Sequence, residues 1–391
     1  MMRTTVGIVG GGPAGLLLAR LLRRSGIDCV VLESRDRAYV EQRQRAGILE
    51  QGAADILREC GAGERMDREG LVHDGIELRF ARRSHRIDFP SLTGGRRVMV
   101  YAQTEVVKDL IRLHLEDGTP LLFEATATAI TGIDADRPVI HFVHEGREKT
   151  LTCEYVVGCD GFHGITREAI RGAITTYEHV YPYSWLGILA DVPPSCDELI
   201  YAHSERGFAL HSMRGRTVSR LYLQVPNGSG VDEWPDDRIW DELDARFAID
   251  GDWKLERGPI TSKAVLPMRS FVTEPMRYRR VFLAGDAAHI VPPTGAKGLN
   301  LALGDVAVLA RAFIYLHTTG SSELLDAYSD TRLRRVWRAE HFSYFMTTTL
   351  HLGPEQTPFQ TRLQLAQLER IVTSRAAAAE LAENYTGLPL Y

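Results

Sequence analysis

The sequence predicts a mixed α/β (α+β) fold, in which a parallel sheet with covering helices carries an inserted antiparallel β-sheet and a helical C-terminal segment. Three observations predict it: a strand, a glycine-rich turn and a helix at the N-terminus, alternating apolar residues over much of 180–267, and helical spacing beyond 299. With 391 residues, of which 44% are hydrophobic, the chain can bury a large core in two or more domains.

The N-terminal stretch is the most informative part of the chain. Residues 6–9 form an apolar run that predicts a buried strand, and residues 16–24 predict a helix. Between them, Gly10, Gly12 and Gly15 satisfy the pattern G-x-G-x-x-G. The first glycine allows a tight turn, the second lets a pyrophosphate approach the backbone, and the third lets the helix pack against the strand.

A second apolar run, at 29–32, ends in Glu33, which lies 18 positions after Gly15. In a Rossmann-like unit a carboxylate at this place accepts hydrogen bonds from ribose hydroxyls, which favours FAD or NAD over NADP. The alternative is a glycine-rich turn in an unrelated strand–helix unit. Because strand, turn, helix, second strand and acid all occur in order, we predict a dinucleotide site.

Charge and cysteine content exclude several classes of protein. The formal net charge is −5 and arginine is mixed with acidic residues, so nucleic acid is not an expected partner. The five cysteines are odd in number and contain no C-x-x-C pair, which favours buried thiols over disulfides or a metal site. We expect a soluble cytoplasmic protein, because no apolar run reaches the roughly 18 residues of a membrane span.

The nucleotide-binding parts are expected to be separated in the sequence. A dinucleotide-binding domain is predicted from 1–73, 98–179 and 268–349, a β-sheet substrate domain from 74–97 and 180–267, and a helical C-terminal segment from 350–391. Long helices are predicted over 299–316, 324–344 and 361–384.

Three separated motifs point to one family. They are Gly10 to Gly15 with Glu33, then Cys159-Asp160-Gly161, and then Gly285-Asp286-Ala287-Ala288-His289 followed by Pro292-Pro293. Over essentially its whole length the chain resembles the single-component flavoprotein aromatic hydroxylases. The Asp-Gly motif of that family often continues to a serine, whereas this chain continues with Phe162-His163-Gly164. That departure narrows the subfamily to hydroxylases of 4-hydroxybenzoate.

The resemblance implies that FAD is the bound dinucleotide. A helix start after the Pro292-Pro293 loop would place backbone N–H groups against the flavin edge that becomes negative on reduction. Asp286 would hold ribityl or ribose hydroxyls, which is compatible with a helix N-cap role. Lys297 would add to the positive field at the helix start, and the alternative is an exposed lysine. The FAD-binding residues implied are Gly10, Gly12, Gly15, Glu33, Arg45, Gln103, Asp160, Arg220, Asp286, Lys297, Gly298, Leu299 and Asn300.

A substrate pocket is implied on the inserted sheet. Ser212 and Arg214 fall on one face of a strand, and Arg220 and Tyr222 fall on one face of the next, because side chains alternate in strands. From the residues alone, a polar solvated sheet face is the favoured interpretation. By resemblance, Arg214 pairs with a substrate carboxylate, Ser212 and Tyr222 assist it, and Arg220 sits by the flavin.

The phenol end of the substrate is assigned by resemblance to Tyr201 and Tyr385. The residues alone would leave both as ordinary half-buried tyrosines. A phenol has a pKa of about 10, so forming a phenolate near neutral pH needs a hydrogen bond such as Tyr201 can supply. Tyr385 would pass the proton on, with His73 as the solvent-side end of the relay, and the carbonyl of Pro293 would contact the substrate hydroxyl.

The reaction implied is hydroxylation of 4-hydroxybenzoate at the 3-position to 3,4-dihydroxybenzoate. It uses NAD(P)H and O2 and proceeds through a flavin C4a-hydroperoxide. The nicotinamide nucleotide is assigned to Arg35, Tyr39, Arg45, His163 and Arg269, with NADPH favoured over NADH. Ser34 precedes Arg35 where an Arg-Gln pair is familiar, and a solvated helix face is the alternative for this charged segment. The resemblance also implies a homodimer.

Three other functions stay open on the sequence alone. The first is a flavin hydroxylase for another hydroxy- or aminobenzoate, in which the ring hydroxyl would lose its register with Tyr201. The second is an FAD-dependent reductase that does not activate oxygen. The third is a non-catalytic dinucleotide-sensing module, which would have no need of Arg214, Tyr201 and Tyr385 together.

Overall fold

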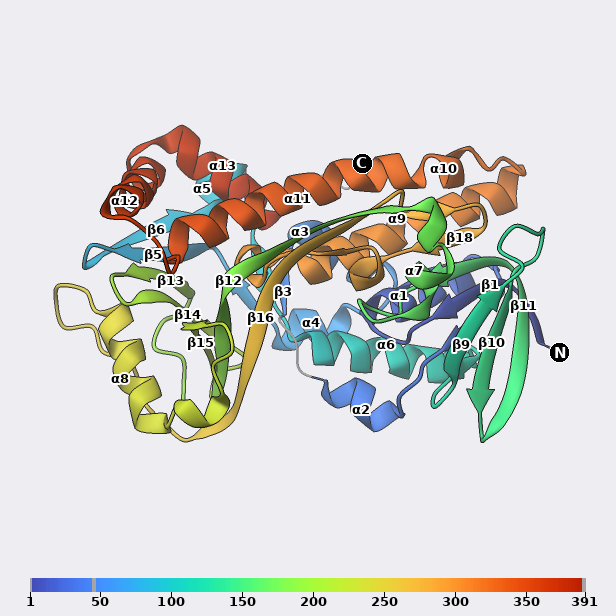
Figure 1. Cartoon of the computed structure of the whole chain (residues 1–391), viewed down its shortest axis with the longest axis horizontal. Helices are drawn as coiled ribbons and strands as arrows, with labels where there is room; N and C mark the ends of the chain where they lie inside the picture. The colour runs from blue at the N-terminus through green and yellow to red at the C-terminus, as the bar shows by residue number, and fades with distance from the viewer. Residues whose placement is uncertain (1, 44–46, 389–391) are drawn as a thin grey trace.

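The computed structural model describes residues 2–43 and 47–388. Within them, two eight-stranded sheets stand side by side, and a three-stranded sheet joins β3 (Ile48–Leu49), β7 (Val98–Val100) and β4 (Leu71–His73). Figure 1 shows the first sheet on the right, the second on the left, and the long helix α11 (Tyr328–Leu350) running above both. The mixed α/β class predicted from the sequence is confirmed.

The first sheet is built around β1 (Met2–Val9). Its neighbours β2 (Cys29–Leu32) and β11 (Arg147–Gly158) both run parallel to it. The parallel part continues outward to β8 (Leu121–Leu122) beside β2 and to β18 (Val281–Leu283) beside β11. The antiparallel strands that complete the sheet are β9 (Thr126–Thr131), β10 (Val139–His144) and β17 (Arg277–Tyr278). This is the Rossmann-like half that the N-terminal motif predicts.

Three helices cover this sheet: α1 (Pro13–Arg24), α6 (Gln103–Asp117) and α9 (Gly298–Thr319). By length and composition α9 could cross a membrane, with a mean hydropathy of 1.6 in its most apolar window. However, 67% of that window is buried and the helix packs directly against α1. The apolar character of α9 is therefore that of a core helix.

The second sheet is antiparallel except where β5 pairs in parallel with β13. Its order is β19-β16-β12-β15-β14-β13-β5-β6. In chain order these strands are β5 (Gly75–Phe80), β6 (Arg83–Asp88), β12 (Thr175–Ala190), β13 (Leu199–Ser204), β14 (Gly207–Met213), β15 (Ser219–Pro226), β16 (Ile260–Glu274) and β19 (His289–Ile290). The two longest, β12 and β16, pair along the middle of the molecule and each crosses a predicted domain boundary (Figure 1). The division into domains stays a prediction.

The two faces of this sheet are both covered. Leu221, Leu223 and Val225 pack in one core with helix α8 (Asp236–Phe247), whereas Tyr222 packs in another core with the C-terminal helices. The predicted segregation of these side chains is confirmed. The solvated face that the residues alone favoured is wrong at Tyr222, which is 7% exposed.

The C-terminal helices differ in number from the prediction. Where one helix was expected over 324–344, α10 (Glu323–Asp326) precedes α11, and where one was expected over 361–384, α12 (Pro358–Thr373) is followed by α13 (Arg375–Thr386). The break occurs at Ser374, whose side chain accepts a hydrogen bond from the N–H of Ala377 and so caps α13. The remaining helices are α2 (Arg37–Gln42), α3 (Gln51–Glu59), α4 (Glu64–Glu69), α5 (Phe89–Thr93) and α7 (Ile165–Ala169).

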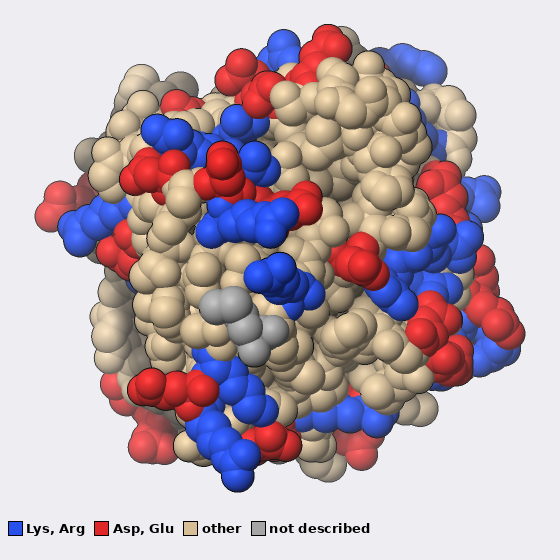
Figure 2. Space-filling view, turned by 90° about the vertical axis from the view of Figure 1, so that its right-hand side faces the viewer, with Lys and Arg blue, Asp and Glu red and all other residues tan. Residues whose placement is uncertain are grey.

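Charged side chains of both signs are interspersed over the face shown in Figure 2. This distribution agrees with the sequence, in which arginine alternates with acidic residues rather than forming one basic block. An extended electrostatic surface for nucleic acid is not present on this face.

Replacement of the cap of α13 tests whether the helix is held locally. We expect Ser374→Ala to lower the free energy of unfolding by about 1 kcal/mol, because an N–H at the helix start loses its acceptor. Ser374→Asp keeps an acceptor and is the matched control. Chemical denaturation, together with hydrogen exchange at 377–386, measures the effect. Equal protection of these amides in both variants would show that tertiary packing alone fixes α13.

Candidate functional site

The carboxyl ends of four parallel strands meet in one row. The register pairs Val9 with Leu32 and with Gly158, and it pairs Gly158 with Leu283. The chain leaves this row at Gly10, at Glu33, just before Asp160 and just before Asp286. The three motifs that are far apart in the sequence therefore share one edge of the sheet. In open α/β sheets, this is the edge where nucleotides bind.

The glycine turn has the shape that a pyrophosphate needs. Gly10 has a φ of +106°, and a Cβ there would collide with the backbone of Cys159. A Cβ at Gly15 would collide with the carbonyl of Gly10. Gly12 is different, because a Cβ there would meet no atom of the described residues within 4 Å. The space in front of Gly12 is an open cradle into which a pyrophosphate fits.

The carboxylates of Glu33 and Asp160 lie close to the glycine turn. Glu33 Oε2 accepts a hydrogen bond from the N–H of Gly11 at 2.7 Å, and its second lone pair stays available to a ribose hydroxyl. Asp160 Oδ2 accepts from the N–H and the hydroxyl of Thr166, whereas its Oδ1 is buried and has no partner among the described residues. Burial raises the pKa of Asp160. A donor from a cofactor would satisfy this orphaned oxygen.

Asp286 and the start of α9 complete the cradle. Asp286 is exposed in the short turn η3 (Gly285–Ala287). Among the described residues no side chain caps the start of α9, so the N–H groups of its first turn lie at the positive end of a long helix without a capping side chain. The contact of these groups with the negative edge of a reduced flavin stays a prediction.

Lys297 is buried, so the alternative of an exposed lysine is wrong. It is 2% exposed, and its Nζ donates to Glu50 Oε1 at 2.6 Å and to the carbonyl of Tyr385 at 3.0 Å. Arg335 donates to the other oxygen of Glu50 at 2.9 Å. Burial lowers the pKa of Lys297, and the Glu50 carboxylate opposes that change. Two cations against one acid leave a positive field beside the start of α9.

Asn300 supports this region through its side chain. Its Oδ1 accepts from the N–H of Glu50 at 2.8 Å, and its Nδ2 donates to the carbonyl of Ile48 at 2.9 Å. The predicted contribution of Asn300 to the cofactor therefore depends on its backbone N–H. Gln103, which is predicted to contact FAD, is the first residue of α6 and is partly exposed.

The predicted tyrosine pair is brought together in the core. Tyr201 on β13 and Tyr385 on α13 are each 1% exposed, and their hydroxyl oxygens lie 2.7 Å apart. Tyr201 is in register with Leu210, which is in register with Tyr222, so Tyr201 and Tyr222 point to the same face of the sheet. Burial raises the pKa of Tyr201 far above its ordinary value, so its phenol stays protonated and able to donate.

The residues predicted to bind the substrate carboxylate lie on the same face of the sheet, next to Tyr222. Ser212 on β14 is opposite Arg220 on β15, and the Arg220 guanidinium lies 5.1 Å from the ring centre of Tyr222. Arg214 follows β14, and burial lowers its pKa to about 10. Because burial penalises its charge, a bound carboxylate would stabilise this guanidinium.

His73 does not occupy the solvent-side position that was predicted for it. Its side chain is 2% exposed, and neither ring nitrogen has a partner among the described residues. It ends β4, where pairing with β7 holds it inside the protein. Burial lowers the pKa of His73, so the ring is neutral at pH 7. Pro293 is exposed, and its carbonyl accepts from the N–H of Ala296 at 3.0 Å, which leaves one lone pair.

The residues predicted for the nicotinamide nucleotide form two groups. Arg35 lies 5.0 Å from the ring centre of Tyr39, and both are exposed near α2, which buries none of its side chains. The ring centres of His163 and Phe162 lie 5.0 Å apart. The guanidinium carbon of Arg269 lies 4.7 Å from the ring centre of Phe162. Arg45 lies outside the described residues.

Sequence reasoning missed a buried triad behind the third motif. Asp305 Oδ2 accepts from the N–H of Gly285 at 2.9 Å and contacts His289 Nε2 at 2.6 Å, while Arg332 donates to its Oδ1 at 2.8 Å. Asp305 is fully buried. The signal that could have revealed it is a lone acid in the apolar run of α9. The triad fixes the backbone that presents Asp286.

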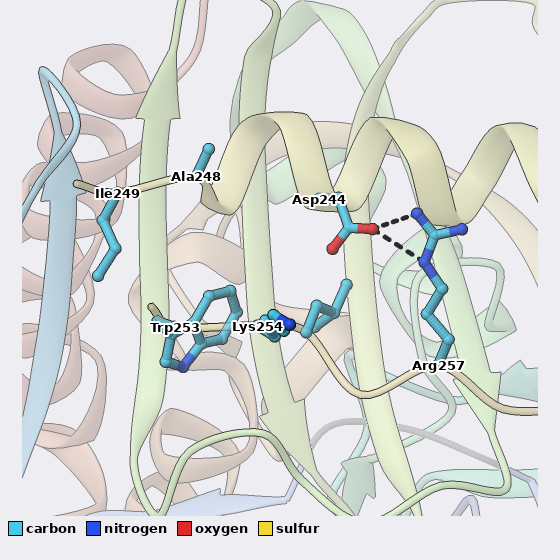
Figure 3. A pocket seen from close by; sticks show the side chains of 7 residues that line it. Asp244, Ala248, Ile249, Trp253, Lys254 and Arg257 are labelled. Carbon is cyan, nitrogen blue, oxygen red and sulfur yellow. Dashed lines mark hydrogen bonds and ion pairs between the residues drawn. The ribbon is translucent and has the colours of Figure 1, made fainter. Parts of the chain in front are cut away.

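A pocket of about 430 Å³ lies elsewhere, at the end of α8. Figure 3 shows Asp244 pairing with Arg257 at its rim, with Trp253 and Lys254 beside them. None of the predicted site residues lines this pocket. It adjoins the core that α8 forms with the opposite face of the sheet, so it is separate from the tyrosine pair.

Replacement of Gly12 tests the cradle without disturbing the fold. Its φ of −76° suits any residue, and the open space accepts a side chain, so we expect Gly12→Val to leave the apoprotein as stable as wild type. The valine would occupy the pyrophosphate position, so FAD affinity should fall by at least about 100-fold. Gly172→Val, also into open space, is the control. Thermal unfolding without FAD and flavin fluorescence titration measure the two effects. Retained FAD affinity in Gly12→Val would contradict the assigned cradle.

Known proteins match this chain in sequence and in fold. The family model described as "FAD binding domain" matches residues 3–343. The p-hydroxybenzoate hydroxylase of Acinetobacter baylyi is 48% identical over 99% of this chain and 96% of that protein. A probable NADH-specific resorcinol 4-hydroxylase of Rhodococcus jostii is 25% identical over 95% of this chain and 69% of that protein. Among solved structures, p-nitrophenol 4-monooxygenase from Pseudomonas putida superposes with a TM-score of 0.85 at 21% identity, covering 99% of both chains. The chain belongs to the FAD-binding family that includes p-hydroxybenzoate hydroxylase.

Proposed function

We propose that this chain is an FAD-dependent monooxygenase that hydroxylates 4-hydroxybenzoate at the 3-position to give 3,4-dihydroxybenzoate. The observation that carries the proposal is the buried hydroxyl pair of Tyr201 and Tyr385 on the sheet face that also presents Ser212. One end of this face suits a phenol and the other suits a carboxylate. The 48% identity to a p-hydroxybenzoate hydroxylase supports the same substrate.

The carboxylate and the phenol of the substrate are assigned to different residues. Arg214 binds the carboxylate, with Ser212 and Tyr222 as hydrogen-bond partners, because a guanidinium that is mostly buried gains most from an anionic ligand. Tyr201 donates to the substrate oxygen and so favours its phenolate form, and Tyr385 accepts or donates the next proton. The carbonyl of Pro293 contacts the same hydroxyl.

Bound FAD would supply the oxidising chemistry, taking electrons from a nicotinamide nucleotide and activating O2. The glycine turn and the carboxylates of Glu33, Asp160 and Asp286 hold its dinucleotide part. The start of α9, with Lys297 behind it, stabilises negative charge on its ring. Arg220 borders the same face of the sheet and is assigned to flavin position.

We assign the electron donor as NADPH, with NADH as the alternative. The exposed pair of Arg35 and Tyr39 offers a cation and a ring to a phosphorylated adenosine, and Arg45 is part of the same assignment. His163 and Arg269, gathered at Phe162, are assigned to the rest of the nucleotide. A homodimer stays part of the proposal, carried by the family resemblance.

Removal of one hydroxyl tests the relay. We expect Tyr201→Phe to lower kcat on the order of 100-fold, because the substrate loses the donor that stabilises its phenolate. The bound substrate should also titrate at higher pH than in wild type, which its ultraviolet absorbance reports. Tyr183→Phe removes a hydroxyl from another tyrosine of the same core and serves as control. An unchanged titration of the bound phenol in Tyr201→Phe would contradict the assigned role.

Substrate comparison tests the whole function. We expect 4-hydroxybenzoate to stimulate NADPH oxidation and O2 uptake together and to yield 3,4-dihydroxybenzoate in equal amount. Benzoate lacks the hydroxyl and 3-hydroxybenzoate carries it out of register with Tyr201, so neither should give this coupled product. Stimulation that yields only H2O2 would make the ring an effector, and the substrate assignment would be wrong. No stimulation by any of the three would refute the pocket and leave an FAD-binding protein.

A further inference from the structure

A second pocket, of about 380 Å³, lies between β12, β16 and α11. We call it the aromatic pocket. Its lining residues are Tyr177, Glu178 and His179 on β12, Ser270, Phe271 and Val272 on β16, and Trp337, Glu340, His341 and Tyr344 on α11. None of them belongs to the site assigned above. Its volume suits a single ring with a short side chain.

Aromatic side chains form the walls of the aromatic pocket. Tyr177 is 47% exposed, Trp337 40% and Tyr344 47%, although rings of this size are normally buried. The rings of Tyr177 and Trp337 meet edge to face with centres 5.5 Å apart. The ring of His179 meets that of Tyr344 at 5.8 Å in the same manner. These contacts hold the walls in place and leave ring surface open to a ligand.

Glu340 places a buried carboxyl group in this wall. It is 5% exposed, and its Oε2 accepts from the hydroxyl of Ser270 at 2.8 Å. Its Oε1 is buried and has no hydrogen-bond partner among the described residues. Burial raises the pKa of Glu340 to about 7. A buried carboxylate without a cation is costly, so a positive group seated next to it would be stabilised.

The charges around Glu340 favour a cation over an anion. The residues that line the pocket include two acids and neither lysine nor arginine. Glu178 is already paired with Arg269 at 3.2 Å, whereas Glu340 has no ion pair among the described residues. The nearby His289 acts to lower the pKa of Glu340, against the effect of burial. Aromatic faces attract cations through the negative charge of their π-systems, and this attraction grows when water is excluded.

We propose that the aromatic pocket binds a small organic ammonium ion that carries an apolar body. The ammonium group lies beside the carboxylate of Glu340, and the apolar part lies between the rings of Tyr177, Trp337 and Tyr344. The proposal is independent of the hydroxylation of benzoates, because none of its residues takes part in that assignment.

Calorimetry with three molecules of one shape tests it. The probes are 2-phenylethylammonium, neutral 2-phenylethanol and the anion phenylacetate, each titrated into the FAD-loaded enzyme at pH 8, where most of Glu340 is ionised. We expect the ammonium ion to bind at least about tenfold more tightly than the alcohol, and phenylacetate not to bind at this site. Glu340→Gln keeps the shape of the wall and should abolish that preference. Glu355→Gln, at an exposed acid outside the pocket, is the matched control and should retain it.

The outcomes that overturn the proposal are distinct. Equal affinity for the ammonium ion and the alcohol would show that charge plays no part. Equal ammonium affinity in Glu340→Gln and Glu355→Gln would place the binding elsewhere. Absence of binding to the wild-type enzyme, with a second copy of the chain found over Trp337 and Tyr344, would show that the aromatic pocket is an interface. FAD content and thermal unfolding confirm that each variant is folded.

Discussion

The buried contact among Lys297, Glu50 and the carbonyl of Tyr385 ties three parts of the molecule together. Lys297 is the N-cap of α9, Glu50 precedes α3, and Tyr385 comes from α13. Such a contact is costly to break, because a buried ammonium group without its partners would have to lose its proton or move out to solvent. The start of α9, assigned to the flavin, and Tyr385, assigned to the phenol relay, are therefore held by the same ammonium group.

The arrangement divides the chemistry between two sheets. The first sheet ends its parallel strands in one row and offers glycines and carboxylates to the dinucleotide. The second offers a buried face with hydroxyls and guanidinium groups to an aromatic acid. The long strands β12 and β16 reach from one region to the other, so the distance between cofactor and substrate is set by continuous backbone rather than by a flexible linker (Figure 1).

Local patterns predicted the fold class and the dinucleotide cradle, because each rests on residues close together in the chain. The turn at Gly10 and the strand that ends at Glu33 are of this kind. Contacts between residues far apart in the sequence could not be predicted in this way. No local pattern indicates that Glu50 pairs with Lys297 or that Asp305 pairs with Arg332. Family resemblance placed Tyr201 and Tyr385 together, but it put His73 at the solvent, where the three-stranded sheet instead buries it.

Tyr385 follows every other residue assigned to the site in chain order. A growing polypeptide leaves the ribosome N-terminus first, and its early parts begin to fold before the later ones exist. The flavin cradle can therefore assemble while α13 is still being made. Only when α13 docks does Lys297 gain the carbonyl of Tyr385, and only then does Tyr201 gain its partner. The hydroxyl pair assigned to the substrate therefore forms only after α13 has been synthesised.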